Sequence, residues 1–125
     1  MGARKAVVCD DDRAMAEILK HLLEKEGYSV WSASGGEESA DLIEAERPQL
    51  LIVDVQSARK EGLALLQRLG PSVFRQGVIV LAQAEHEELH WKARAMGASK
   101  VVKKPFLAAE LARAIHEVAF RNVPQ

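Results

Sequence analysis

Charged residues directly follow short apolar runs at three places in this sequence. They are Asp10, Asp11 and Asp12 after residues 6–9, Asp54 after residues 50–53, and Lys103 and Lys104 at the end of a run that begins at residue 99. Carboxylates brought close together repel one another, which raises their pKa values unless a cation compensates the charge. Mg²⁺ is such a cation, since it takes one or two carboxylates together with water and phosphoryl oxygens. If the fold gathers the three clusters, they favour a Mg²⁺ site that faces a lysine.

Five apolar runs have the composition of buried strands. They cover residues 6–9, 28–33, 50–54, 78–81 and 99–103. Several are continuous in apolar residues rather than alternating, which indicates burial on both faces and therefore a parallel sheet.

Amphipathic stretches between these runs are predicted as helices. Ser34 and Glu37 have the spacing of a capping box at the start of the second helix, which Pro48 must end. Apolar residues at helical spacing predict the buried faces of the other four helices. These faces are Met15, Ile18, Leu19, Leu22 and Leu23; Leu65, Leu66 and Leu69; Leu89, Ala93 and Met96; and Leu107, Leu111, Ile115 and Val118.

Five strand–helix units in 125 residues have the size of βα repeats in an open parallel sheet, and the chain is too short for an eight-stranded barrel. We predict an α/β fold: a doubly wound five-stranded parallel sheet, flavodoxin-like (βα)5, with strand order 2-1-3-4-5. It forms a single domain over residues 1–125, with its core at about 4–120 and a short C-terminal tail. Ligands of such sheets bind where the strand order reverses, beyond the carboxyl ends of the strands. Asp10 and Asp54 then follow neighbouring strands, with Lys104 opposite.

The balance of charge excludes several classes of partner. Lys and Arg total 17 against 18 for Asp and Glu, which gives a net charge of −1 and no basic surface for nucleic acid or an anionic membrane.

The strongly apolar runs are far shorter than the roughly 20 residues that span a bilayer. A single cysteine excludes an internal disulfide. These features lead us to expect a cytoplasmic location.

Three other residues have structural explanations. Asp12 is predicted as the N-cap of the first helix rather than as a metal ligand. Lys103 is expected to be a solvated neighbour of Lys104, and Cys9 a buried thiol.

In this arrangement the sequence resembles the receiver domains of two-component response regulators, including the single-domain chemotaxis type. The resemblance covers residues 4–120. The residues that carry it are the pair Asp10–Asp11, Asp54, Gly62 eight residues after Asp54, and Lys104-Pro105-Phe106. All of them stand in order and at the family's spacing on a five-unit βα frame.

The resemblance implies a role for each of these residues. Asp54 is similar to the phosphoacceptor, which takes a phosphoryl group from the histidine of a kinase or of a phosphotransfer protein. Asp10, Asp11, Asp54 and the backbone carbonyl of Gln56 correspond to the Mg²⁺ ligands. Lys104 resembles the ammonium that pairs with the acceptor carboxylate and then with the phosphoryl oxygens.

Further properties come with the same resemblance. A receiver catalyses only its own phosphorylation and dephosphorylation, and it signals through a downstream protein that contacts the fourth helix, fifth strand and fifth helix. The bond between Lys104 and Pro105 is expected to be cis.

Three positions depart from the family's pattern. Where the family has Thr or Ser at the end of the fourth strand, this chain has Ala82. Where it usually has Tyr or Phe three residues before the lysine, this chain has Val101, and Ala58 stands where the family favours Pro. The switch residues Ala82 and Val101 thus lack the hydroxyl and the aromatic ring that relay phosphorylation to the fourth helix. Two interpretations stay open: a phosphorylatable receiver, and a receiver-like interaction module that works without phosphorylation.

A third hypothesis comes from residues 86–90, which match the H-E-x-x-H signature of zinc peptidases. His86 and His90 would hold zinc, and Glu87 would act as the general base. No further zinc-peptidase motif follows and a receiver fold has no cleft for a peptide, so we expect no zinc. Both histidines are predicted to lie at the surface, on the shoulder of the buried stripe. Trp91 is expected to be partly exposed, as a candidate partner contact.

Overall fold

Within residues 4–55, 61–70 and 76–121, which the computed structural model describes, five strands alternate with five helices. The strands are β1 (Arg4–Cys9), β2 (Tyr28–Ala33), β3 (Leu50–Asp54), β4 (Gly77–Gln83) and β5 (Lys100–Lys104). The helices are α1 (Arg13–Lys25), α2 (Gly36–Glu46), α3 (Glu61–Leu69), α4 (Glu87–Met96) and α5 (Ala108–Arg121). In these ranges no helix combines the length and the apolar character needed to cross a membrane.

The strands form one parallel sheet in the order β2-β1-β3-β4-β5. From β1 the chain first adds β2 on one side and then crosses back to place β3 on the other side. The strand order therefore reverses between β1 and β3. The predicted α/β flavodoxin-like fold is confirmed.

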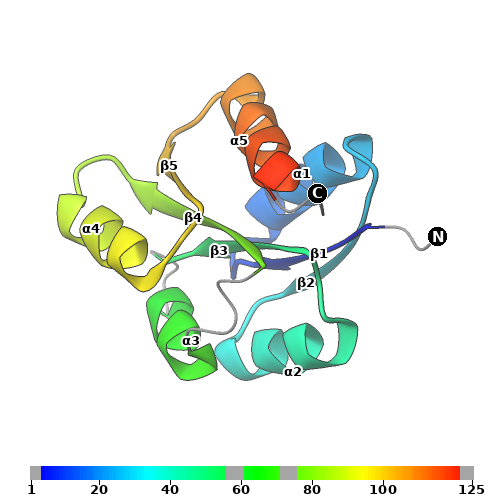
Figure 1. The fold of residues 1–125 in the computed structure, drawn as a ribbon, viewed down its shortest axis with the longest axis horizontal. Helices are drawn as coiled ribbons and strands as arrows, with labels where there is room; N and C mark the ends of the chain where they lie inside the picture. Colours follow the sequence, from blue (N-terminus) through cyan, green and yellow to red (C-terminus); the bar gives the residue numbers. More distant parts are fainter. Residues whose placement is uncertain (1–3, 56–60, 71–75, 122–125) are drawn as a thin grey trace.

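Helices cover both faces of the sheet, with α1 and α5 on one face and α2, α3 and α4 on the other (Figure 1). Successive residues of a strand point to opposite faces. Val8 accordingly packs in the core beneath α1 and α5, whereas its neighbour Val7 packs in the core beneath α2 and α3. The central strands β1, β3 and β4 contribute to both cores. Their need for apolar side chains on both faces explains why their sequences are continuously apolar.

Two side chains predicted for buried helical faces lie at the surface instead. Ile18 is 50% exposed, because α1 packs through Ala16, Leu19 and Leu23, and the covered face is narrower than the apolar stripe. Leu107 is 70% exposed. It precedes α5, which begins one residue later, and its backbone N–H donates to Oε1 of Glu110 at 3.0 Å.

The predicted capping box at the start of α2 is also wrong. Gly35 is the N-cap, with no hydrogen bond from a capping side chain. The backbone N–H of Ser34 instead donates to Oε2 of Glu38 at 3.4 Å. The helix begins one residue later than the capping-box spacing implied, so Glu38 rather than Glu37 reaches back to the start of the helix.

Candidate functional site

The carboxyl ends of the strands bring the predicted chemical residues to one edge of the sheet. Cys9 pairs with Val53 across β1 and β3, so Asp10 and Asp54, the next residue of each chain segment, follow side by side. On the other side of β3, β4 separates Asp54 from β5, whose last residue is Lys104. The long side chain of Lys104 crosses this distance.

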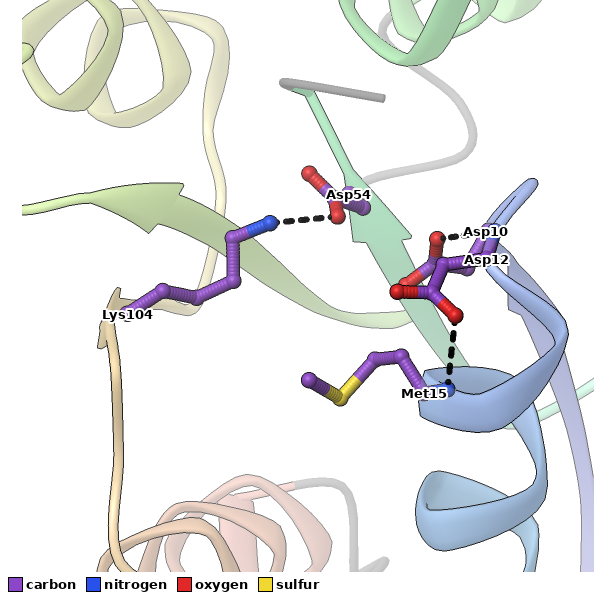
Figure 2. Close-up of polar contacts among 5 residues, drawn as sticks. All are labelled: Asp10, Asp12, Met15, Asp54 and Lys104. Atoms are coloured by element: carbon purple, nitrogen blue, oxygen red, sulfur yellow. Dashed lines mark hydrogen bonds and ion pairs between the residues drawn. The ribbon is translucent and has the colours of Figure 1, made fainter. Parts of the chain in front are cut away.

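Lys104 Nζ donates to Oδ2 of Asp54 at 2.6 Å. The side chain of Asp54 is 4% exposed and that of Lys104 is 18% exposed. Figure 2 shows the ammonium reaching Asp54 from the side opposite to Asp10 and Asp12. Removing one partner of such a buried pair leaves the other charge uncompensated, which is strongly unfavourable. Lys104 therefore fixes the position of the Asp54 carboxylate.

One carboxylate oxygen of Asp10 accepts a hydrogen bond and the other does not. Its Oδ1 accepts from the backbone N–H of Asp12 at 2.9 Å, whereas Oδ2 is buried without a hydrogen-bond partner. Burial raises the pKa of Asp10 from 3.8 to about 6; the Asp12 N–H opposes this shift, and the charge of Asp54 adds to it. A buried carboxylate oxygen without a donor fits a cation, because a cation would supply the missing favourable contact.

Asp11 and Asp12 differ from Asp10 in their surroundings. Oδ1 of Asp12 accepts from the backbone N–H groups of Ala14 at 3.0 Å and Met15 at 3.2 Å, which confirms Asp12 as the N-cap of α1. Figure 2 shows the bond from Met15. Asp11 is partly exposed and lines a small hollow together with Asp10 and Asp54. Asp12 thus caps α1, while Asp11 lines the hollow.

The hollow is not a preformed metal cage. In residues 4–55, 61–70 and 76–121, no three side chains of Cys, His, Asp or Glu are grouped so that they could hold a metal ion. Gln56 and Ala58 lie outside the described residues. The donor set is nevertheless suited to Mg²⁺, since it consists of carboxylate oxygens and one of them has no partner.

Gly62 lies in α3, directly against the backbone that follows Asp54. A Cβ atom at this position would stand 2.3 Å from the carbonyl oxygen of Asp54 and 2.8 Å from Cα of Val55. Real side chains do not approach a backbone so closely, so only glycine allows α3 to pack here. Gly62 therefore serves the shape of the site without carrying chemistry.

Cys9 and Ser39 also line the hollow, and Ser39 was not predicted from the sequence. Burial raises the pKa of the Cys9 thiol to about 11, against a weaker lowering effect of the hydrogen bond with Ser39. The thiol is therefore protonated at neutral pH and has little nucleophilic character. This agrees with the prediction of a buried cysteine. A serine within an amphipathic helix carries no signal that could have identified Ser39.

Ala82 and Val101, the proposed switch positions, lie in β4 and β5. Ala82 is fully buried in β4 beside Lys103 of β5, and its methyl group offers no hydrogen-bond donor. Val101 is partly buried and packs against the core beneath α4. Lys103 is exposed, as expected. The bond between Lys104 and Pro105 is cis, which confirms the expectation from the resemblance.

The two histidines of the H-E-x-x-H match have different surroundings. His86 is exposed at the N-cap of α4. The prediction that His90 lies at the surface is wrong: it is only 7% exposed, and its Nε2 contacts the carbonyl oxygen of Gln83 at 3.0 Å. The ring turns inward because this carbonyl at the end of β4 lies within its reach. Trp91 is 78% exposed, which is more than the partial exposure expected.

The sheet topology and the acidic hollow with its lysine define a class: a doubly wound α/β protein with a carboxylate–ammonium pair at the switch point. Residues 6–116 match the model of the response regulator receiver domain, and the chain belongs to this family. It is thus a receiver domain of two-component response regulators. Domains of this kind are typically signalling modules rather than enzymes.

Solved structures support this assignment. The chain is 26% identical to a CheY-like response regulator receiver domain protein from Methanospirillum hungatei JF-1, with 97% of each chain covered and a TM-score of 0.87. It is 27% identical to a response regulator from Chloroflexus aurantiacus J-10-fl, with 96% of this chain and 100% of that chain covered and a TM-score of 0.85. A likeness to NtrX from Brucella abortus, at 24% identity and a TM-score of 0.85, covers 98% of this chain but 28% of that chain, and shows the fold alone.

Proposed function

We propose that this receiver accepts a phosphoryl group on Asp54 from a histidine kinase or a phosphotransfer protein. The observation that carries the proposal is the buried Asp54–Lys104 pair beside Asp10, whose Oδ2 has no partner. This arrangement supplies a fixed carboxylate nucleophile and an ammonium group beside it. A place for one further cation completes the set. Phosphoryl transfer depends mainly on positioning and on neutralising charge, and these groups provide both.

In the transfer, one carboxylate oxygen of Asp54 forms the new bond to phosphorus. The bond from phosphorus to the donor's histidine nitrogen breaks, and that nitrogen keeps the electron pair. Lys104 lies 2.6 Å from the carboxylate, so its ammonium can follow the charge onto the phosphoryl oxygens. The reaction is confined to this protein's own phosphorylation and dephosphorylation.

Mg²⁺ is the cation that we assign to the site. Asp10, Asp11 and Asp54 would hold it, together with the backbone carbonyl of Gln56. The ion would supply positive charge to the phosphoryl oxygens. Because the carboxylates are not grouped as a metal cage, we expect their side chains to rearrange on binding.

A small-molecule phosphodonor tests the proposal directly. Protein incubated with the donor and Mg²⁺ should gain one phosphoryl group by intact mass, and chelation of the metal should prevent the gain. Asp54→Asn should abolish it, while Asp11→Ala should weaken Mg²⁺ binding. Asp41→Asn, a change at an exposed aspartate of α2, is the matched control and should behave as wild type. Wild-type protein that gains no phosphoryl group from a reactive donor would refute the proposal.

The output surface that we propose is the α4–β5–α5 face, through which a downstream protein would bind. Trp91 on α4 is 78% exposed and supplies a large apolar side chain of the kind enriched in interfaces. We further propose that residues 1–125 form one cytoplasmic receiver domain that binds neither nucleic acid nor membrane.

A second candidate function is a receiver-like module whose binding does not depend on phosphate. The specific observation in its favour is the buried methyl group of Ala82 where the family has a hydroxyl, together with the small side chain of Val101. The two functions differ in one measurement. In a regulated receiver, a partner's affinity for wild type changes on phosphorylation and its affinity for Asp54→Asn does not. In the second case the affinity is the same for all forms.

A further inference from the structure

A buried histidine ties α4 to the end of β4. The carbonyl oxygen of Gln83 lies 3.0 Å from Nε2 of His90, and since a carbonyl only accepts, the ring donates from Nε2. The same oxygen accepts from the backbone N–H of His86 at 3.1 Å. The last residue of β4 therefore holds both the start of α4 and a side chain from its second turn.

The attachment point stands next to the proposed phosphorylation site. Gln83 is paired with Lys104 in the register of β4 and β5, and the backbone N–H of Ala84 donates to the carbonyl of Lys104 at 3.4 Å. Lys104 in turn holds Asp54. The hydrogen bond between His90 and Gln83 thus joins the end of β4, beside the site, to the helix that carries Trp91.

Displacement of α4 from β4 would break this bond inside the protein. His90 is 7% exposed, so water could not readily replace the carbonyl, and a buried donor without a partner is unfavourable. Ala82 provides no hydrogen bond to a phosphoryl oxygen that could offset this loss. The long side chain of Lys104 can also follow a phosphoryl group without moving its own backbone.

We propose that His90 is a positioning residue that clamps α4 to the end of β4 and keeps the Trp91-bearing face in one arrangement, whether or not Asp54 is phosphorylated. This regulatory consequence rests on the proposed function of Asp54. The clamp itself does not.

The clamp is tested first in unmodified protein by hydrogen exchange. His90→Leu removes the donor and keeps an apolar side chain, and amide exchange in residues 87–96 should become roughly 5- to 100-fold faster. His90→Gln keeps an N–H donor and should restore most of the protection. His86→Gln changes the exposed histidine of the same motif and is the matched control. Unchanged exchange in His90→Leu, or the same acceleration in His90→Gln, would contradict the clamp.

The second arm restores the missing hydroxyl. Ala82→Ser adds one oxygen at the end of β4. Trp31→Phe is introduced as the background of these variants, so that Trp91 is the only tryptophan and its fluorescence reports on α4. With beryllofluoride and Mg²⁺ as the phosphoryl mimic, Ala82→Ser alone should change exchange in α4 by less than about twofold. The double variant Ala82→Ser, His90→Leu should change it about tenfold or more, with a matching change in Trp91 emission.

Two results would overturn the clamp's role: a single Ala82→Ser variant that responds as strongly as the double variant, or a double variant that binds the mimic and does not respond. Binding of the mimic is followed separately by ¹⁹F NMR. If no variant binds it, the proposed function of Asp54 fails, while the exchange rates of the unmodified variants still decide whether His90 clamps α4.

Discussion

The burial of Asp10 lowers the stability of the folded protein when its carboxylate is ionised. Burial raises its pKa from 3.8 to about 6, so the ionised carboxylate is less stable in the folded protein than in the unfolded chain. Asp10→Asn should therefore stabilise the metal-free protein, by up to about 3 kcal/mol at pH 7.5. The gain is full above pH 6, where the wild-type group is ionised in both states. It shrinks as the pH falls below about 6 and disappears below 3.8, where the group is protonated in both.

Thermal unfolding of both proteins in chelator, across pH 4 to 7.5, measures this difference. The same substitution should weaken Mg²⁺ binding, so saturating Mg²⁺ should reduce or reverse the gain. An Asp10→Asn variant less stable than wild type at pH 7.5 without metal would show that the ionised carboxylate of Asp10 does not destabilise the folded protein.

Lys104 should stabilise the fold through Asp54 specifically. Lys104→Met keeps most of the side-chain volume but leaves a carboxylate that is 4% exposed without its ammonium partner. We expect a loss of about 3 kcal/mol in the free energy of unfolding at pH 7.5. In an Asp54→Asn background the same change should cost less than about 1 kcal/mol, which a double-mutant cycle by urea unfolding measures. Equal costs in both backgrounds would mean that the pair contributes little.

Among the elements, α3 depends on one glycine for its position beside the site. Alanine normally stabilises a helix relative to glycine by about 1 kcal/mol. In Gly62→Ala, however, the new Cβ would lie 2.3 Å from the carbonyl oxygen of Asp54, so α3 or the end of β3 must move. We expect a destabilisation on the order of 2 kcal/mol and slower phosphorylation of Asp54.

Ala64→Gly, an exposed change in the same helix, is the control for propensity: it should cost about 1 kcal/mol and leave phosphorylation unchanged. If Gly62→Ala stabilises the protein, the close packing of α3 against the backbone after Asp54 is refuted.

The strands were predicted well because burial on both faces leaves a direct mark on the sequence. The continuous apolar runs of β1, β3 and β4 can only be satisfied between two layers of helices. The limits of the buried helix faces were predicted less well, since the spacing of apolar residues gives the direction of a buried face but not its width. Ile18 belongs to the stripe of α1 and yet is 50% exposed. His90 shows the converse: nothing in its spacing revealed that a strand carbonyl would draw its ring inward.

For the molecule as a whole, the topology explains why the grouping of the candidate site's residues could be predicted from the sequence. Once the strand order was inferred, the ends of β1, β3 and β5 had to meet at one edge, which brought together Asp10, Asp54 and Lys104. The partnerless oxygen of Asp10 and the close approach of Gly62 depend on side-chain and backbone placement at the scale of single ångströms. Sequence patterns carry no such detail.

At this scale, the decisive property is how strongly the site is coupled to the α4–β5–α5 face. A hydrogen bond to a charged group contributes roughly 1.5–3 kcal/mol, and modest allosteric coupling has a similar size, about 1–3 kcal/mol. Ala82 cannot make that bond, and Val101 is too small to exchange a buried for an exposed ring. A ligand shifts an equilibrium only by its differential affinity for the two states. We therefore expect phosphorylation to change a partner's affinity at this face by less than about tenfold.

NMR shift mapping of the wild-type protein with beryllofluoride and Mg²⁺ checks this expectation before any partner is known. The changes should concentrate around Asp10, Asp54 and Lys104, which surround the added group. Ala82→Ser serves as a comparison, because it returns a hydroxyl to the end of β4 while His90 still holds α4. Large changes spread over residues 84–103 of the wild type would show that another group has replaced the hydroxyl. The face would then follow phosphorylation after all.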